Sequence, residues 1–150
     1  MKNTLCMALA LALLVAGCSR SPEKYLKRGQ EYFAEGKYSE AVLEFRNALK
    51  KNPRFAPAHY ELGRTYLAMG GTEEGGQSIL TAAEIDPNNL DAQLAGGNFL
   101  LMQRKFDEAR AKAELIVKKD PSSVPGNILL NNTMAGKVDL NASIGELLRG

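Results

Sequence analysis

The sequence predicts an all-α protein, an α-solenoid of antiparallel helix pairs with three full repeats and an incomplete fourth. Two features of the 150 residues lead to this prediction. The first is a period of 34 residues, shared by two residue series: Pro53, Pro87 and Pro121, and Gly29, Gly63 and Gly97. The second is the helical spacing of the apolar residues, with no strand-like alternation in any segment. A helix pair leaves one apolar face open, so repeated pairs must stack to bury it.

The first repeat, residues 22–55, shows its two helices most clearly. The larger apolar side chains fall at positions 25, 26, 32 and 33, and then apolar residues recur at 38, 41, 42, 45, 48 and 49. Both sets have the spacing of an amphipathic helix. They predict helices over 23–35 and 38–51, separated by Gly36-Lys37. Asn52-Pro53 ends the second helix because a residue before proline is pushed out of helical geometry.

The same register divides the rest of the chain into residues 56–89, 90–123 and 124–150. Four units of two helices predict eight helices in four antiparallel pairs. Residue 150 is position 27 of the fourth unit, and no Asn-Pro or Asp-Pro stop follows. Because a solenoid needs a terminal cap with a polar outer face, Ile144, Leu147 and Leu148 are expected to expose apolar surface here. This favours an array longer than the present chain.

Glycines inside the predicted helices have two interpretations. Gly29 is expected to let paired helices approach closely, against Ala41 and Ala48. Gly75-Gly76 and Gly96-Gly97 each carry an extra glycine, which costs up to about 1 kcal/mol relative to alanine in a helix interior. These pairs indicate either a hinge or sequence drift in a redundant scaffold, and drift is the favoured interpretation.

The period and the residue types resemble the tetratricopeptide repeat family, whose period is 34 residues. The first unit matches the family pattern at these places: Tyr25, Gly29, Tyr32, Gly36, Tyr38, Ala41, Phe45, Ala48 and Pro53. The second and third units keep most of these places. The fourth keeps mainly apolar residues and has Asn131 where the others have glycine.

The N-terminus resembles that of an exported lipoprotein. Lys2 and an apolar run of 12 residues form the pattern of a signal peptide over residues 1–17, and the run is too short for a membrane span of about 20 residues. Val15-Ala16-Gly17-Cys18 resembles the lipobox of bacterial lipoproteins. That resemblance implies fatty acylation at Cys18, a short link over 18–21 and, with Ser19 next, residence at the outer membrane facing the periplasm. The alternative is an ordinary signal peptide that happens to end beside a cysteine.

Resemblance to the repeat family also implies a partner-binding groove along the first helix of each unit. It comprises Leu26, Gln30, Phe33, Tyr60, Arg64, Leu67, Leu94, Asn98 and Leu101. Two apolar rows flank a row of amide and guanidinium donors, which suits an extended peptide segment of a partner protein. The alternative is that the apolar rows mostly bury against neighbouring helices.

One ligand of the family is disfavoured here. The carboxylate-clamp members, which grip the C-termini of chaperones, need lysines and asparagines at set places on these helices. The matching places carry Leu26, Gln30, Asp91 and Ala95. A neutral and an acidic side chain would not hold a terminal carboxylate.

Composition and motifs exclude most chemistry. A net charge of +2 gives no field for binding nucleic acid. His59 is the only histidine, and removal of the signal peptide with Cys6 leaves Cys18 as the only cysteine, so no metal site or cysteine–histidine pair can form. No glycine-rich phosphate motif follows a strand. We therefore expect no enzyme, no cofactor and no metal.

The order of lipobox, short polar link and immediate first repeat resembles the N-terminal part of exosortase- and exopolysaccharide-associated repeat lipoproteins. The segment that carries this resemblance runs from Cys18 to Tyr25. It implies a lipid-anchored scaffold that mediates protein–protein interactions at the bacterial envelope. Two alternatives are a pilotin-like lipoprotein that assists pilus or secretin assembly, and a module that binds polysaccharide or peptidoglycan.

Overall fold

The protein is described by a computed structural model that covers residues 21–148, without the side chains of 141–143 and 145–147. Within this range it has seven helices and no strand. They are α2 (Pro22–Ala34), α3 (Tyr38–Lys51), α4 (Ala56–Ala68), α5 (Thr72–Ile85), α6 (Leu90–Met102), α7 (Phe106–Lys119) and α8 (Val124–Leu147). None of these helices is long and apolar enough to cross a bilayer. The predicted signal peptide and the predicted acylation site, Cys18, lie outside the described residues.

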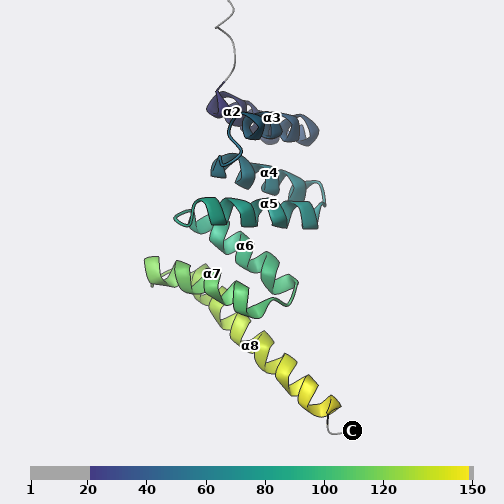
Figure 1. Cartoon of the computed structure of the whole chain (residues 1–150), viewed down its shortest axis with the longest axis vertical. Coiled ribbons are helices and arrows are strands. Elements are labelled where there is room, and N and C mark those ends of the chain that lie inside the picture. Colours follow the sequence, from purple (N-terminus) through teal and green to yellow (C-terminus); the bar gives the residue numbers. More distant parts are fainter. Residues whose placement is uncertain (1–20, 149–150) are drawn as a thin grey trace, which may run out of the picture.

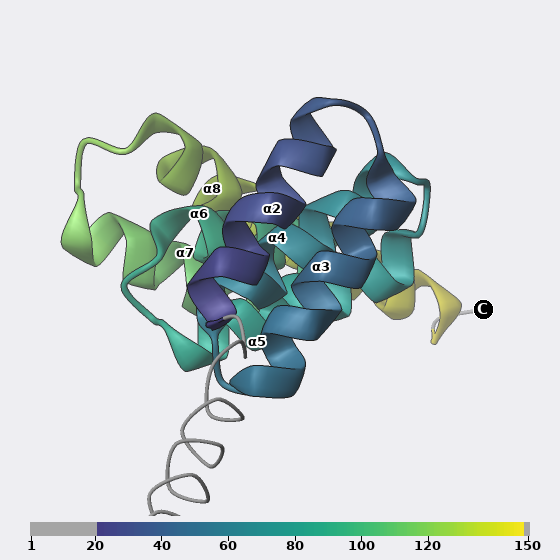
Figure 2. The same cartoon turned by 90° about the horizontal axis from the view of Figure 1, so that it is seen from above.

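The helices stack in sequence order into a solenoid. Figure 1 shows α2 to α7 layered along the long axis as three hairpins, and the view from above in Figure 2 places the hairpins over one another. Each helix packs on the next one along the chain, and first helices of neighbouring units also touch, α2 on α4 and α6 on α8. The predicted fold class is confirmed, and the two helices of the first unit begin and end within one residue of their predicted bounds.

The turn inside each hairpin has the same backbone geometry. The backbone φ is +73° at Gly36, +85° at Gly70 and +59° at Arg104, one residue in each unit at position 15. In the first unit, the Lys37 amide donates to the Tyr32 carbonyl (2.9 Å) and the Gly36 amide donates to the Phe33 carbonyl (3.0 Å). This is the Schellman motif, which ends a helix with one left-handed residue.

Arg104 holds this left-handed conformation without being glycine. Because a side chain at positive φ costs about 1 kcal/mol or more, we expect Arg104→Gly to raise the free energy of unfolding by about 0.5–1 kcal/mol. Lys105→Gly is the matched control, since Lys105 has φ −85° and glycine there only adds freedom to the unfolded chain. Urea unfolding of the two variants checks this: equal loss of stability in both would contradict the strain at Arg104.

The fourth unit does not form the predicted pair of helices. Its residues 124–147 are one helix, α8, of 24 residues. Position 15 of this unit is Val138, and a β-branched residue at positive φ is a genuine outlier. The Schellman turn therefore cannot form at Val138, and the helix continues straight through the place where the other three units reverse.

The core consists of small clusters between successive helices. Phe45 is fully buried with Ala41 and Leu62. A methyl group at Gly29 would lie 2.4 Å from the Phe45 ring. Gly29 therefore admits the Phe45 ring, rather than the expected Ala41 and Ala48, which are nonetheless fully buried.

Three of the four glycines in the two glycine pairs, Gly75, Gly76 and Gly97, are packing positions, so the favoured interpretation as drift is wrong for them. All four residues of Gly75-Gly76 and Gly96-Gly97 are buried. A methyl group at Gly75 would lie 2.9 Å from the Gly63 carbonyl oxygen, and one at Gly76 would lie 2.3 Å from the Phe99 ring. A methyl group at Gly97 would lie 2.5 Å from Leu129. Contact between helices at these three places leaves no space for a side chain, whereas the nearest atom at Gly96 is the Leu80 Cδ2 methyl group at 3.0 Å.

Candidate functional site

The first helices of the units, α2, α4 and α6, carry the predicted groove residues on one surface, which we call the helix-A face. Local signals in the sequence position these helices. The Ser21 hydroxyl accepts from the Lys24 amide at the start of α2 (3.4 Å), and the Asn89 side chain accepts from the Ala92 amide at the start of α6 (3.0 Å). Both are N-caps. Pro57 lies in the first turn of α4, where its missing donor is not needed.

The two apolar rows of the helix-A face are half-buried. Leu26 and Phe33 pack on the first core cluster, and Tyr60 packs on a second cluster of alanines between α5 and α6. Leu94 and Leu101 pack on a third cluster around Ile116 and Leu129, whereas Leu67 is 43% exposed. The apolar side chains other than Leu67 thus rest on the core, and each leaves part of its surface accessible. Partner binding by these rows stays a prediction.

Arg64 lies at the centre of the helix-A face between two aromatic rings. Its guanidinium carbon is 5.2 Å from the Phe33 ring centroid and 5.8 Å from the Tyr60 ring centroid. Its Nη1 donates to Glu61 Oε2 at 3.1 Å, and Gln30 donates from Nε2 to Glu61 Oε1, also at 3.1 Å. These contacts join α2 to α4 and hold the guanidinium in one place by cation–π and ionic attraction.

Glu61 was missed by sequence reasoning, which identified only its two donors. The signal was available, because Glu61 and Arg64 are three residues apart on one helix and such pairs face each other. Glu61 neutralises Arg64, so this cation is already paired. The ion pair has 14% exposure at the Glu61 side chain and 45% at the Arg64 side chain, which leaves the outer face of the guanidinium in contact with solvent.

A negative charge, Asp91, lies next to the groove residues. Asp91 is exposed in the first turn of α6 and makes no ion pair within the described part of the chain. Burial, and secondly the charge of Asp91, raise the pKa of the Tyr60 phenol, so Tyr60 is neutral at physiological pH. Asn98, another groove residue on α6, is also exposed. Around Arg64, the groove residues therefore present apolar and amide groups, with the carboxylate of Asp91 beside them.

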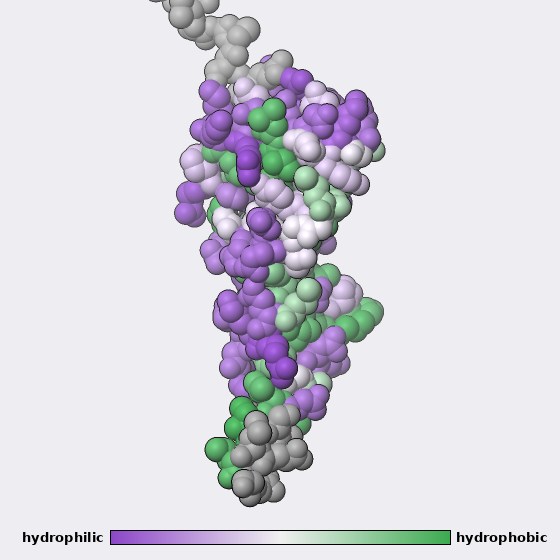
Figure 3. All heavy atoms as spheres, turned by 90° about the vertical axis from the view of Figure 1, so that its right-hand side faces the viewer, coloured by the Kyte–Doolittle hydropathy of each residue, from purple (hydrophilic) through white to green (hydrophobic). Residues whose placement is uncertain are grey.

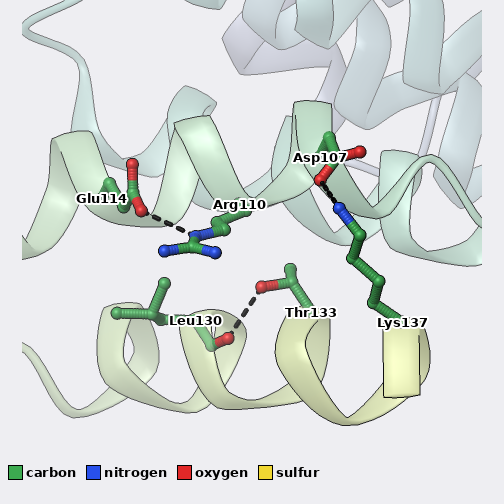
Figure 4. A network of polar contacts seen from close by, with 6 residues as sticks. All are labelled: Asp107, Arg110, Glu114, Leu130, Thr133 and Lys137. Atoms are coloured by element: carbon green, nitrogen blue, oxygen red, sulfur yellow. Dashed lines mark hydrogen bonds and ion pairs between the residues drawn. The ribbon is translucent and has the colours of Figure 1, made fainter. Parts of the chain in front are cut away.

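A second surface, between α7 and α8, was not predicted. A hollow of about 300 Å³ is lined by Phe106, Asp107 and Arg110 of α7 and by Thr133, Met134 and Val138 of α8. Figure 4 shows its polar contacts: Lys137 Nζ pairs with Asp107 Oδ1 at 2.6 Å, Arg110 Nε pairs with Glu114 at 2.7 Å, and the Thr133 hydroxyl donates to the Leu130 carbonyl at 2.7 Å. The signal for this surface was Val138 at the turn position.

The one histidine of the sequence has a structural partner. His59 Nε2 lies 2.9 Å from the Pro53 carbonyl oxygen, to which it donates in the tautomer with a proton on that nitrogen. It thereby joins α4 to the preceding loop. Among residues 21–148, no three His, Cys, Asp or Glu residues are grouped as a metal ion would require. What the two surfaces offer is contact area and hydrogen bonds for recognition.

Comparisons with known proteins agree with this geometry. Human Superkiller complex protein 3 is 29% identical over 124 residues, which is 79% of this chain and 8% of that protein. DnaJ homolog subfamily C member 3 from Bos taurus is 29% identical over 106 residues, which is 71% of this chain and 21% of that protein. The chain thus spans a small part of these relatives.

Solved structures and family patterns identify the repeats. The first TPR of Spaghetti (RPAP3) bound to HSP90 peptide SRMEEVD has a TM-score of 0.69 and 16% identity, and the alignment covers 81% of this chain and 96% of that one. At that identity, it shows the fold alone. Residues 29–70 match the TPR repeat pattern, and residues 60–124 match the tetratricopeptide repeat pattern. Together these matches cover more than half of the sequence, and the chain belongs to the tetratricopeptide repeat family.

Proposed function

We propose that this scaffold for protein–protein interactions binds an extended segment of a partner protein on the helix-A face. The observation that carries the proposal is the platform of Phe33, Arg64 and Tyr60, held by Glu61 and Gln30. Arginine and tyrosine at the centre of an accessible surface are the residue types that dominate binding energy at protein interfaces. The half-buried apolar rows on either side supply places for apolar side chains of the bound segment.

The charges of this face favour a neutral or basic segment over an acidic one. Spaghetti (RPAP3) binds an HSP90 peptide with the sequence SRMEEVD. In the present chain the only cation among the groove residues, Arg64, is paired with Glu61, and the free charge is the carboxylate of Asp91. An acidic peptide would meet repulsion at Asp91 and find no unpaired cation among the groove residues.

Peptide titration tests this proposal. We expect the peptide SRMEEVD to bind at least about tenfold more weakly than a version with lysine at both glutamates and the aspartate, measured by fluorescence polarisation at low salt. Asp91→Asn should weaken the basic peptide about threefold, as expected for one exposed charge pair. Glu84→Gln, an exposed carboxylate on α5, is the matched control and should change nothing. Tighter binding of the acidic peptide would contradict the charge argument.

We also propose that the scaffold is lipid-anchored through Cys18 at the bacterial outer membrane, facing the periplasm. The support is Val15-Ala16-Gly17-Cys18 followed by Ser19. Helix α2 begins at Pro22, so about four residues, or about 14 Å of extended chain, would separate the lipid from the first repeat. Such a short tether would hold the helix-A face close to the membrane surface.

Mass spectrometry of the mature N-terminus checks this anchor. The expected product starts at Cys18 and carries several acyl chains, which together give stable membrane binding. Cys18→Ala should accumulate the unprocessed precursor, whereas Ser19→Ala should still be processed. A mature chain that starts elsewhere, or that has an unmodified Cys18, would contradict the anchor.

At this location we propose a role in exopolysaccharide export or protein sorting, with recruitment of a protein component by the helix-A face. The order of lipobox, short link and immediate first repeat supports this role over that of a pilotin. A sugar-binding role is disfavoured because the Arg64 guanidinium already stacks near both aromatic rings, Phe33 and Tyr60, and sugar stacking needs exposed ring faces.

A further inference from the structure

Helix α8 has an apolar surface that no other helix of the described chain covers. Figure 1 shows α8 running past α7 and out of the stack, and in Figure 3 apolar side chains gather at this lower end of the molecule. Val138 is 66% exposed, Ile144 46% and Leu148 83%. Met134, on the rim of the α7–α8 hollow, is also exposed. In the first three units, the second helix of the hairpin packs on the corresponding surface of the first helix.

The sequence of residues 140–148 matches the second helix of the other units. Leu140 stands at the place of Tyr38 and Phe106, and Leu147 stands at the place of Phe45 and Ile79. Ser143 takes a place that is alanine or glycine in the other units. The fourth unit therefore contains both halves of a hairpin, a first helix over 124–137 and a segment patterned as its partner.

The two halves cannot meet within one chain, because the turn that would bring them together is absent. The other units reverse at a residue with positive φ, and Val138 at this place continues α8 as a helix. Without the turn, the segment 140–148 cannot reach the surface of 124–137 in its own chain. It can still pack on the same surface of a second copy, which is domain swapping.

We propose that two copies of this chain associate through α8, with residues 140–148 of each copy packing on residues 124–138 of the other. The two α8 helices would run antiparallel, and the contact would be the same on both copies, as two-fold symmetry requires. This association is independent of the helix-A face.

The hairpins of the other units fix the register of this contact. Gly29 meets Phe45, Gly63 meets Ile79, and a methyl group at Gly75 would lie 2.8 Å from Leu67. Two repeats after the contacts of Gly63 and Gly75, and three repeats after that of Gly29, these pairs correspond to residue 131 facing 147 and residue 135 facing 143 of the second copy, symmetric about residue 139. Asn131 replaces the glycine, so the second helix would lie farther from the α8 axis than in the hairpins.

The charges at this surface permit the contact. Two ion pairs, Lys137–Asp107 and Arg110–Glu114, lie beside the α7–α8 hollow, and the two charges within each pair neutralise each other. Between them the hollow presents Phe106, Met134 and Val138. An incoming apolar helix would thus cover apolar surface without burying an unpaired charge from this rim.

Disulfide trapping tests the exchange. The full chain with Cys6→Ser and Cys18→Ser carries no native thiol, and Ala135→Cys with Ser143→Cys places one thiol on each half of α8. We expect oxidation to give a covalent dimer on a denaturing gel, and sedimentation of the parent chain to show a dimer. A monomer that forms no disulfide, or a monomer closed by a disulfide within its own chain, would overturn the proposal.

Val138→Gly supplies the decisive variant, because glycine can adopt the turn. In that background we expect the same two thiols to close within one chain, and the dimer dissociation constant to rise at least about tenfold. Val138→Ala, which keeps the helix but cannot readily turn, is the matched control and should remain dimeric. Equal dimer content in the glycine and alanine variants would show that the missing turn does not cause the association.

Discussion

Gly76→Ala is expected to lower the free energy of unfolding by about 2 kcal/mol, although alanine is the better helix former by about 1 kcal/mol. The new methyl group would lie 2.3 Å from two atoms of the Phe99 ring and 2.4 Å from its Cγ. The overlap includes Cγ, the ring atom nearest the backbone, so a small rotation of the side chain cannot remove it. Phe99 is also buried. The contact between α5 and α6 would have to open. The free energy lost by such overpacking exceeds the free energy gained from the higher helix propensity of alanine.

Gly96→Ala is the matched control for this prediction. Gly96 is also buried in a helix, but its nearest neighbour would be the Leu80 Cδ2 methyl group at 3.0 Å. Leu80 is only half-buried, so its methyl group can move aside. We expect Gly96→Ala to be neutral or to stabilise the protein by up to about 1 kcal/mol. Urea unfolding followed by circular dichroism checks both variants, and equal destabilisation would contradict the packing account.

Simultaneous Tyr60→Ala and Arg64→Ala should weaken binding of the partner segment at least about 30-fold. The double variant removes the centre of the platform and leaves Glu61 without its cation, and central aromatic and arginine residues typically contribute 2 kcal/mol or more at interfaces. Helical content should change little, because Arg64 is exposed and Tyr60 is only half-buried on α4. Titration with the basic peptide measures the loss.

The matched control is a second arginine–tyrosine pair on another surface. Arg46 donates from Nη2 to the Tyr66 hydroxyl at 2.6 Å, and its guanidinium carbon is 5.9 Å from that ring centroid. Arg46→Ala with Tyr66→Ala removes the same residue types without touching the helix-A face. If this control weakened binding as much as the Tyr60 and Arg64 double variant, the partner segment would not be specific to the platform.

The repeat architecture could be predicted because its determinants are local and periodic. Pro53 and Gly36 end their helices through backbone geometry alone, and the apolar spacing defines which face of each helix is buried. The same signals recur 34 residues later in the second unit. Arg104 departs from the pattern without changing the fold, because the packing of α6 on α7 holds an ordinary residue in a left-handed conformation.

The features that could not be predicted depend on single residues or on contacts between repeats. Val138 at the turn position converts a hairpin into one long helix, whereas Arg104, which also departs from glycine at that position, leaves the turn intact. The buried Gly75 and Gly76 looked like defects because Leu67 and Phe99, which occupy the space that their side chains would fill, come from other helices. Glu61 escaped notice because its importance comes from Gln30, which lies one repeat away.

Site-specific photocrosslinking tests the central claim, that the helix-A face is the surface that binds a partner. A photoreactive residue at Asn98 lies on this face and leaves Arg64 intact, and the same residue at Glu84 lies on α5. With the basic peptide as the probe, the account predicts an adduct from position 98 that disappears with Tyr60→Ala and Arg64→Ala, and little from position 84. Equal adducts from both positions, or an adduct from position 98 that persists in the double variant, would contradict it.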